Sequence, residues 1–314
     1  MNTVSILIPT HNRKNTIIRA IDSVVSQEYD GIIECIIVDS STNFDIQNLI
    51  ENYIMSLKNN SRIIKYYRND NNEFPYSNWI KLSTLFSGDY VKFLCDDDWL
   101  EHNSVSKLVN EIALNGYSCV ISNINIHKDS IILKNYYDLK EPLTKDLIIN
   151  SIIGIGTKFP ITQSASLFTA VKFSEAFEFS LRNNSCTKLL FGEDLLFNYY
   201  FLFKDNTLGY LNQSLCNSGA TDNSLTKITP KILIDFCNVN SLIVLAKFFG
   251  IKLSRYQKKI MRHTIFMYYL VNSFTSHKMP KLRNESKYLP IPNFIELKRF
   301  LLSEVKKRLW KSNT

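Results

Sequence analysis

The chain has 314 residues, of which 45% are hydrophobic and 21% charged, so disorder is excluded as the main state and one large domain or two ordinary ones are expected. Lysine and arginine number 37 against 29 aspartates and glutamates, which gives a formal net charge of +8. This charge suits anionic partners such as nucleotides, phosphorylated substrates or lipid headgroups, and a basic surface kept for solubility alone fits it equally well. Because no RNA- or DNA-binding motif accompanies the charge, no nucleic-acid partner is expected.

The first half of the chain alternates between short apolar runs and helical patterns. Strands are expected at 4–9, 33–40, 62–69 and 90–94, and helices at 15–26, 46–54, 78–86 and 105–116. This alternation predicts an α/β fold with a Rossmann-like, mostly parallel sheet flanked by helices. Ligands of such sheets bind outside the carboxyl ends of the strands. None of these strands is followed by a GxGxxG or GxxxxGK[ST] loop, so dinucleotide and P-loop sites lose their main support.

The second half of the chain has a different pattern. Residues 117–225 mix short strands, expected near 119–126, 165–171 and 207–211, with one strong helix at 193–203. From about residue 230 onward the pattern is that of packed aromatic helices, for example at 242–249 and 260–271. We therefore expect an α/β domain at 1–225 and a helical C-terminal extension at 226–314.

The segment at 294–311 is patterned as a basic amphipathic helix. Leucine and valine recur on one face, and lysine and arginine fill much of the rest. Such a helix lies on an anionic membrane surface, with Trp310 at the headgroup level. Packing on its own domain with solvated charges is an equally good interpretation.

The cysteines and the apolar segments bear on the compartment. The six cysteines lack CxxC spacing and several lie in apolar runs, so we expect buried thiols in a reducing compartment. The start, MNTVSILIP, lacks the basic region of a signal peptide. The apolar run at 265–274 is shorter than the roughly 20 residues of a transmembrane helix. A cytoplasmic location is expected.

Three consecutive aspartates, Asp96, Asp97 and Asp98, follow the fourth expected strand. Because adjacent carboxylates repel one another, a positive group is expected nearby. Hard divalent cations such as Mg²⁺ or Mn²⁺ take carboxylate oxygens and share them with substrate phosphates. Alternatively, Asp98 is the N-cap of a helix, with Glu101 completing a capping box, and the other two carboxylates lie in a solvated turn.

Two further acidic positions lie where chemistry is expected. Asp39 ends the second expected strand, where it accepts hydrogen bonds from a base or a ribose, or shapes the loop as an Asx-turn. Glu193 and Asp194 open the helix at 193–203. Acids there are favoured by the helix dipole alone, but a carboxylate facing a cleft also makes a good general base.

Four segments in one order, VSILIPTHNR, IIVDSST, SGDYVKFLCDDDWL and FGEDLLF, resemble the GT-A glycosyltransferases of family 2 over roughly residues 1–225. The resemblance implies a GT-A fold. It also implies that Pro9, Thr10 and Asn12 contact the nucleotide-sugar donor. Asp39 would recognise the base, usually uracil, and Asp96 would lie by the ribose.

The resemblance also implies a metal site and a base. Asp97 and Asp98 would hold a Mn²⁺ or Mg²⁺ ion on the diphosphate. Asp194 would be the general base, with Glu193 beside it. The implied reaction is a single inverting displacement that moves a sugar, expected from a UDP-sugar, to an acceptor hydroxyl.

The implied acceptor is a glycan or an undecaprenyl-diphosphate-linked oligosaccharide in bacterial surface polysaccharide synthesis, such as O-antigen or capsule. The enzyme would then be cytoplasmic, or peripheral on the inner face of the plasma membrane through 294–311. The stretch at 158–168 is the expected acceptor wall.

Departures from the family pattern leave alternatives. Cys95 stands where many relatives have an acid, and a late histidine ligand of some relatives is missing here. Either the metal has fewer protein ligands in this chain, or Asp222 substitutes for the histidine. A sugar nucleotidyltransferase-like enzyme would need a glycine in its first loop, and PTHNRKN has none. A non-catalytic partner protein that kept the fold is the other alternative, against which the intact acidic residues argue.

Overall fold

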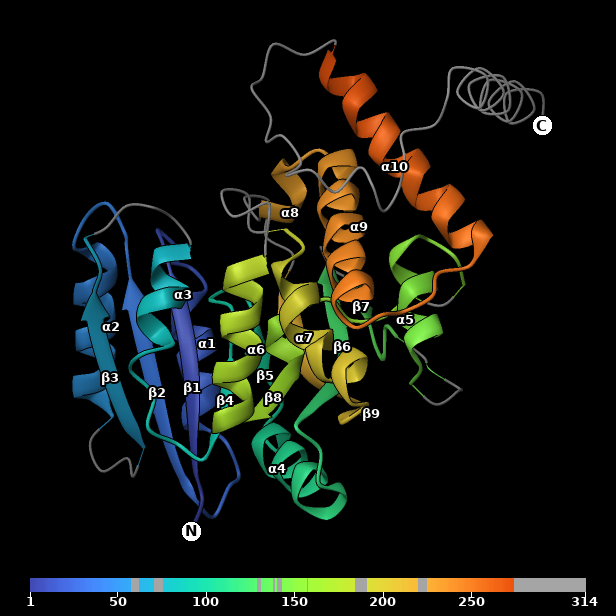
Figure 1. Ribbon diagram of the computed structural model, residues 1–314. Helices are drawn as coiled ribbons and strands as arrows, with labels where there is room; N and C mark the ends of the chain where they lie inside the picture. Colours follow the sequence, from blue (N-terminus) through green and yellow to red (C-terminus); the bar gives the residue numbers. More distant parts are fainter. Residues whose placement is uncertain are drawn as a thin grey trace.

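The computed structural model describes residues 1–57, 62–70, 76–128, 131–137, 139, 143–156, 158–183, 191–219 and 225–273. Its first part alternates strand and helix, as expected (Figure 1). The strands are β1 (Thr3–Thr10), β2 (Ile32–Asp39), β3 (Ile63–Arg68) and β4 (Tyr90–Phe93). The helices between them are α1 (Ile17–Val25), α2 (Asp45–Ser56) and α3 (Tyr76–Leu82).

The first four strands run parallel in the order β3-β2-β1-β4. Strand β2 is buried from Ile33 to Asp39, which explains its continuous apolar sequence, because a strand covered on both faces has no solvent side. The register places Thr10 beside Asp39, and Asp39 beside Arg68. The carboxyl ends of these strands therefore align at one edge of the sheet.

The sheet continues beyond β4 through strands from the second half of the chain. These are β8 (Ser166–Thr169), β6 (Cys119–Lys128), β9 (Leu208–Gly219) and β5 (Trp99–Leu100), in that order, with β7 (Ile131–Leu133) paired to β6. Strand β8 is antiparallel to both β4 and β6, and β9 is parallel to β6. Two antiparallel steps restore the direction, so β6 and β9 end at the same edge as β1.

Helix α7 (Glu193–Lys204) lies at the centre of the molecule, against α6 (Ala170–Asn183), α9 (Lys231–Phe248) and the strands β6 and β9 (Figure 1). Its residues from Leu195 to Phe203 are all buried, so it is apolar on every side rather than amphipathic. Phe197 stands 4.4 Å from Phe168 and 5.3 Å from Phe173 between ring centres. These aromatic contacts hold the first turn of α7 beside the sheet.

The remaining elements surround this centre. They are η1 (Gln163–Ala165), a 3-10 turn, and the helices α4 (Ser104–Asn115), α5 (Lys145–Ile152), α8 (Leu225–Ile228) and α10 (Arg255–Ser273). Helix α9 contacts α5, α7 and α10, and its Val239 and Leu242 belong to the same buried core as the sheet. The division of the chain near residue 225 stays a prediction.

Several expectations about local structure can be compared with the result. The expected strand at 165–171 is shorter, because the chain turns into α6 at Ala170. The capping-box interpretation of Asp98 is wrong: strand β5 follows Asp98 directly, and α4 begins later, after Asn103. Cys35, Cys119 and Cys216 are buried free thiols, as expected. In the described part of the chain, no helix has both the length and the apolar character needed to cross a bilayer.

Candidate active site

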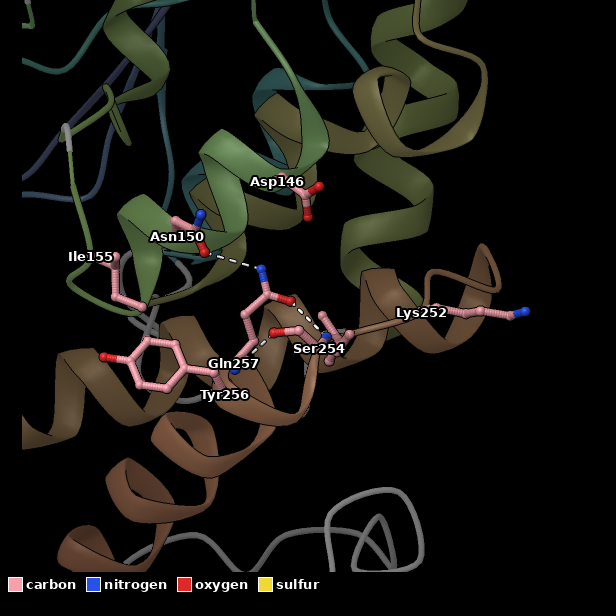
Figure 2. Close-up of a pocket in the computed structure, with 8 residues that line it drawn as sticks. Asp146, Asn150, Ile155, Lys252, Ser254, Tyr256 and Gln257 are labelled. Carbon is pink, nitrogen blue, oxygen red and sulfur yellow. Dashed lines mark hydrogen bonds between the residues drawn. The ribbon is translucent and has the colours of Figure 1, made fainter.

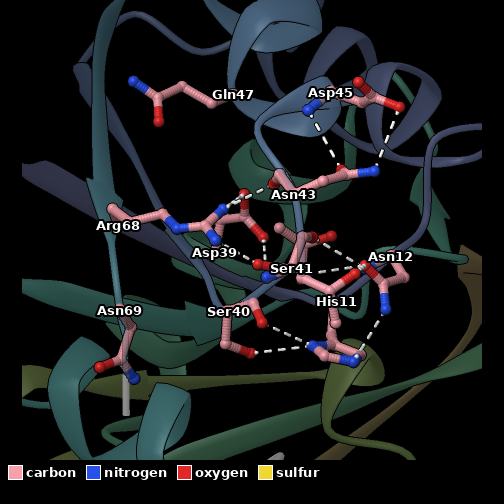
Figure 3. Close-up of polar contacts among 12 residues, drawn as sticks. His11, Asn12, Asp39, Ser40, Ser41, Asn43, Asp45, Gln47, Arg68 and Asn69 are labelled. Atoms are coloured by element: carbon pink, nitrogen blue, oxygen red, sulfur yellow. Dashed lines mark hydrogen bonds and ion pairs between the residues drawn. The ribbon is translucent and has the colours of Figure 1, made fainter. Parts of the chain in front are cut away.

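Asp39 is the most enclosed acid at the edge where the parallel strands end. Its side chain has no exposed surface. One carboxylate oxygen accepts the Ser41 N–H at 2.7 Å, and the other pairs with Arg68 Nη1 at 3.4 Å (Figure 3). The second oxygen also accepts the Tyr66 hydroxyl at 2.9 Å. The contact with Ser41 is the Asx-turn contact that the sequence offered as an alternative. Burial, and then the bond to Asp39, raise the pKa of Tyr66, so its phenol remains a donor.

Arg68 is a site residue that the sequence did not single out. Besides its ion pair with Asp39, its guanidinium donates to the backbone carbonyls of Ser41 and Asn43, the latter at 2.9 Å. It therefore ties the loop after β2 to the end of β3 (Figure 3). The only signal for Arg68 in the sequence was a basic residue at the last position of the third strand. This signal was not enough, because the partners of Arg68 lie at the end of another strand.

The turn after β1 is joined to the turn after β2. Asn12 adopts a positive φ of 55°, which asparagine tolerates better than most residues. Its N–H donates to Ser41 Oγ at 2.8 Å, and its side-chain oxygen accepts the Thr42 N–H at 3.1 Å (Figure 3). His11 Nδ1 lies 2.8 Å from the Ser40 carbonyl oxygen. The turn expected to contact the donor is therefore held in place by hydrogen bonds to the turn after β2.

Asn78 on α3 connects these turns by hydrogen bonds of its side-chain amide. It is 1% exposed, and its amide donates at 3.0 Å to both the Thr10 carbonyl and Ser40 Oγ. Its own oxygen accepts from Asn69 Nδ2 at 2.8 Å. A single amide thus joins the ends of β1, β2 and β3, although the sequence marked Asn78 only as the start of a helix.

The aspartate triplet lies between these ends and β9. Thr10 Oγ1 donates to an Asp96 carboxylate oxygen at 2.8 Å. Asp98 is 4% exposed and accepts the backbone N–H of Gly219 at 3.2 Å. Burial, followed by the charge of Asp97, raises the pKa of both Asp96 and Asp98 to about 7. The triplet is therefore a place where added positive charge is favoured.

Asp194, beside Glu193 at the start of α7, lies close enough to the triplet to be influenced by its charge. Gly192 precedes them with φ of 83°, and a Cβ there would lie 2.6 Å from the Cys237 carbonyl oxygen on α9. Only glycine fits both the conformation and the space. Glu193 is 3% exposed, while burial and then the charge of Asp98 raise the pKa of Asp194 to about 7. The electrostatic influence of Asp98 on Asp194 shows that the structure brings these two motifs together.

Two cations near the triplet were missed by sequence reasoning. Lys92 in β4 has no exposed surface and donates to the backbone carbonyls of Ser164 and, at 3.2 Å, Ser166. Burial lowers its pKa to about 8. Arg19 in α1 donates to the Asp97 carbonyl oxygen at 2.8 Å. For Lys92, the sequence signal was a lysine inside the apolar strand sequence YVKFL. No local sequence signal pointed to Arg19.

The residues present fit a cation shared with a substrate better than a closed protein site. Among the described residues, no three His, Cys, Asp or Glu side chains are grouped so as to hold a metal ion. The triplet offers neighbouring carboxylates, and their burial leaves their negative charge poorly compensated. Proteins commonly bind Mg²⁺ in this way, through one or two carboxylates together with the phosphates of a substrate. Asp222, the candidate further ligand, and the tail at 294–311 lie outside the described residues.

The stretch at 158–168 is mostly buried, and its role as an acceptor wall stays a prediction. Lys158 is exposed, but Phe159, Gln163 and the residues from Ser164 to Phe168 are buried. Ser164 Oγ accepts the Cys95 N–H at 3.0 Å, so this stretch supports the triplet from inside. Pro9 lies within β1 opposite Val38, where it is a strand residue beside the loop.

A separate open cavity of about 630 Å³ lies between α5 and the connection from α9 to α10 (Figure 2). None of the expected site residues lines it; the lining includes Asp146, Asn150, Lys252, Tyr256 and Gln257. The Gln257 amide donates to Asn150 Oδ1 at 3.0 Å, which joins α10 to α5. This cavity is distinct from the acidic edge of the sheet.

Comparison with known proteins agrees with this geometry. The family model "Glycosyl transferase family 2" matches residues 5–172, more than half of the chain. A solved structure of S. aureus TarS 1–349 with UDP-GlcNAc aligns over 91% of this chain and 78% of that one, with a TM-score of 0.59 and 16% identity. The fold is therefore that of the GT-A glycosyltransferases, and the chain belongs to glycosyltransferase family 2.

Relatives named as a glucosyltransferase and a chondroitin synthase are similar to parts of this chain. A GalNAc(5)-diNAcBac-PP-undecaprenol beta-1,3-glucosyltransferase of Campylobacter jejuni is 31% identical over 43% of this chain and 42% of its own length. A chondroitin synthase of Escherichia coli is 26% identical over 69% of this chain and 33% of its own length. The chain thus spans less than half the length of either relative.

Proposed function

We propose that this transferase moves a sugar, with inversion, from a UDP-sugar to a hydroxyl of a glycan or lipid-linked oligosaccharide in bacterial surface polysaccharide synthesis. The observation that supports it is the convergence of Asp39, the Asp96–Asp98 triplet and Asp194 at one edge of the sheet. The named activities of the Campylobacter and Escherichia relatives support the acceptor class. The reaction would take place in the cytoplasm or at the inner face of the membrane.

The donor would lie along the turns after β1 and β2. Asp39 would recognise the base through the oxygen that accepts the Ser41 N–H, which has a further lone pair. Because this side chain has no exposed surface, the loop after β2 would have to shift for a base N–H to reach it. Asp96, already held by Thr10, would accept a ribose hydroxyl. Asp97 and Asp98 would hold Mn²⁺ or Mg²⁺, which when bound supplies positive charge to the leaving diphosphate.

The acceptor hydroxyl would be activated by Asp194. In its ionised form this carboxylate takes the hydroxyl proton as the oxygen attacks the anomeric carbon and the nucleoside diphosphate departs. The start of α7 favours the negative charge through the helix dipole, whereas burial disfavours it. Glu193, more deeply buried, would support the position of Asp194 rather than touch the acceptor.

The donor site is tested by the thermal stability of the full chain with UDP, GDP, dTDP and CMP, each with and without Mn²⁺. UDP is expected to stabilise the wild type only when Mn²⁺ is present, because ligand binding to the folded state shifts unfolding. Asp97→Asn should abolish that response, while Asp194→Asn should keep it and lose sugar transfer. Absence of a response to every nucleotide would overturn the catalytic proposal, and a preference for another nucleotide would overturn the choice of UDP.

A further inference from the structure

Three segments that are distant in the sequence meet at one backbone carbonyl, that of Asp97. Arg19 of α1 donates to this oxygen at 2.8 Å from Nη2. A Cβ at Gly219, the last residue of β9, would overlap the same oxygen and lie 2.8 Å from Arg19 Nη2. The carbonyl is therefore enclosed by the guanidinium and by a position where only glycine leaves room.

Arg19 is itself held by an aromatic ring. Its guanidinium carbon lies 3.8 Å from the centre of the Trp99 ring, a cation–π contact. The Trp99 ring contacts His127 at 4.4 Å between ring centres, and Trp99 pairs with Asn217 in the β5–β9 register. The contact is thus anchored in three strands, since His127 lies in β6 and Asn217 in β9.

A polar chain secures the far side of this arrangement. Asn217 Oδ1 lies 2.9 Å from His127 Nε2, and Asn217 Nδ2 donates to a Glu101 carboxylate oxygen at 2.8 Å. Asn217 is 3% exposed, so these bonds are formed in the interior. These bonds hold His127 in place against the Trp99 ring, and the Trp99 ring in turn holds the Arg19 guanidinium.

The charge of Arg19 also matches its surroundings. Asp97 and Asp98 attract the guanidinium, which offsets part of the cost of its partial burial. A fixed carbonyl fixes the Asp97 peptide, and the peptide determines where the carboxylates of Asp97 and Asp98 can point. The Arg19 guanidinium can both supply positive charge and hold the carbonyl in place, because it is planar, stacks on a ring and donates hydrogen bonds in a set direction.

We propose that Arg19, Trp99 and Gly219 form a clamp on the Asp97 carbonyl that positions the carboxylates of Asp97 and Asp98 for the cation and the donor diphosphate. Arg19 is a positioning residue in this arrangement. The clamp rests on the proposed function, because its purpose is the binding of a metal–diphosphate.

The first test compares Arg19→Lys and Arg19→Gln with the wild type in the full chain. The readout is the Mn²⁺ concentration that gives half of the thermal stabilisation by UDP. Both variants should need about 10- to 100-fold more Mn²⁺, because lysine keeps the charge but cannot reproduce the stacked, directed contact. Arg182→Gln, which alters an exposed arginine paired with Glu178 on α6, should match the wild type.

A second readout needs neither metal nor activity. Hydrogen–deuterium exchange of peptides covering 95–100 should be faster in both Arg19 variants than in the metal-free wild type, because the loop has lost its anchor. Gly219→Ala should give the same two effects with Arg19 intact, by pushing the carbonyl from the other side. The combined Arg19→Gln and Gly219→Ala change should cost less than the sum of the two, as expected for groups acting on one atom.

Distinct results separate the failure of the clamp from failure of the proposed function. If the wild type shows no UDP response with Mn²⁺, the proposed function and the purpose of the clamp are both overturned. If the wild type responds and Arg19→Gln needs the same Mn²⁺ with unchanged exchange, the clamp alone is overturned. The clamp would also be overturned if Arg19→Lys needed the same Mn²⁺ concentration as the wild type while Arg19→Gln needed more. The positive charge of residue 19, and not the position of its guanidinium, would then explain the effect. Should Arg19→Gln fail to fold, Trp99→Phe and Arg19→Lys carry the same comparison.

Discussion

Asp194, the proposed general base, is half-buried at the start of α7 and has a pKa near neutral pH. Burial raises its pKa to about 7, and Asp98 adds to that rise. A base with such a pKa is ionised for part of the molecules at neutral pH and still accepts a proton readily. Its reactivity is therefore set by enclosure at the start of α7, and by the neighbouring triplet.

The activity of the enzyme should follow the ionisation of Asp194. We expect kcat/KM to rise with pH and to level off by about pH 7, because the protonated carboxyl cannot accept the acceptor proton and a bound cation shifts its ionisation to lower pH. Asp194→Asn should lower the rate by about 10²- to 10⁴-fold. Asp205→Asn, at the exposed other end of α7, is the matched control and should leave the rate unchanged. Activity that does not fall as the pH is lowered from 8.5 to 4.5 would rule out this assignment.

The stability of the metal-free protein should depend on pH in the opposite sense to its activity. The folded-state pKa values of Asp96, Asp98 and Asp194 are raised to about 7 from the ordinary value of 3.8. Between these values the folded protein binds more protons than the unfolded chain, so stability is full below about pH 4 for these groups and is lost as pH rises through 7.

For one such carboxyl, the free energy of unfolding should fall by about 2 kcal/mol between pH 5.5 and 8. Urea unfolding at the two pH values measures the difference, and Asp194→Asn should reduce it. Saturating Mn²⁺ and UDP should reduce it too, because added positive charge favours the ionised forms. Greater stability at pH 8 than at pH 5.5 in the metal-free protein would contradict the raised pKa values.

At the scale of elements, the start of α7 depends on Gly192. Its φ of 83° strains any residue with a side chain, and a Cβ would also press on the Cys237 carbonyl at 2.6 Å. Gly192→Ala should therefore lower the free energy of unfolding by about 2 kcal/mol or more. Gly250→Ala is the control, because Gly250 has a φ of 66° with nothing within 4 Å of a Cβ. Equal losses for the two variants in urea unfolding would show that space at Gly192 is unimportant.

Local patterns predicted some elements better than others. The first strands are continuous apolar runs bounded by polar turns, and the helices between them have clear spacing, so both were found. Helix α6 was missed because the chain passes from Thr169 of β8 directly into Ala170 of α6 without a breaking residue. The capping box at Asp98 failed because tertiary pairing of Trp99 with Asn217 draws the chain into β5.

At the scale of the whole molecule, α9 shares the core of the sheet domain. Val239 and Leu242 are buried within the same cluster as the strands, and α9 packs on α7, which carries Asp194. Helix α9 therefore supports the helix that carries Asp194.

This sharing predicts that α9 and the sheet unfold together. Leu242→Ala should cost about 2–5 kcal/mol, because it leaves a cavity in a fully buried position. Lys247→Ala, on the exposed side of α9, should cost little. Circular dichroism and tryptophan fluorescence should report one coincident urea transition for both variants. Two separated transitions would instead favour independent units at 1–225 and 226–314.

The sequence by itself determined the alternation of strands and helices, and it pointed to the acids Asp39, Asp96–Asp98 and Asp194. These follow from local apolar periodicity and from acids at strand and helix ends, which are properties of neighbouring residues. Only the tertiary structure decided the surroundings of these acids. Arg19 is 78 positions from Asp97, and Gly219 is 121 positions from Asp98. Contacts at such separations depend on strand order and register, which no local pattern encodes, and they set the enclosure, the charge balance and the pKa values of the site.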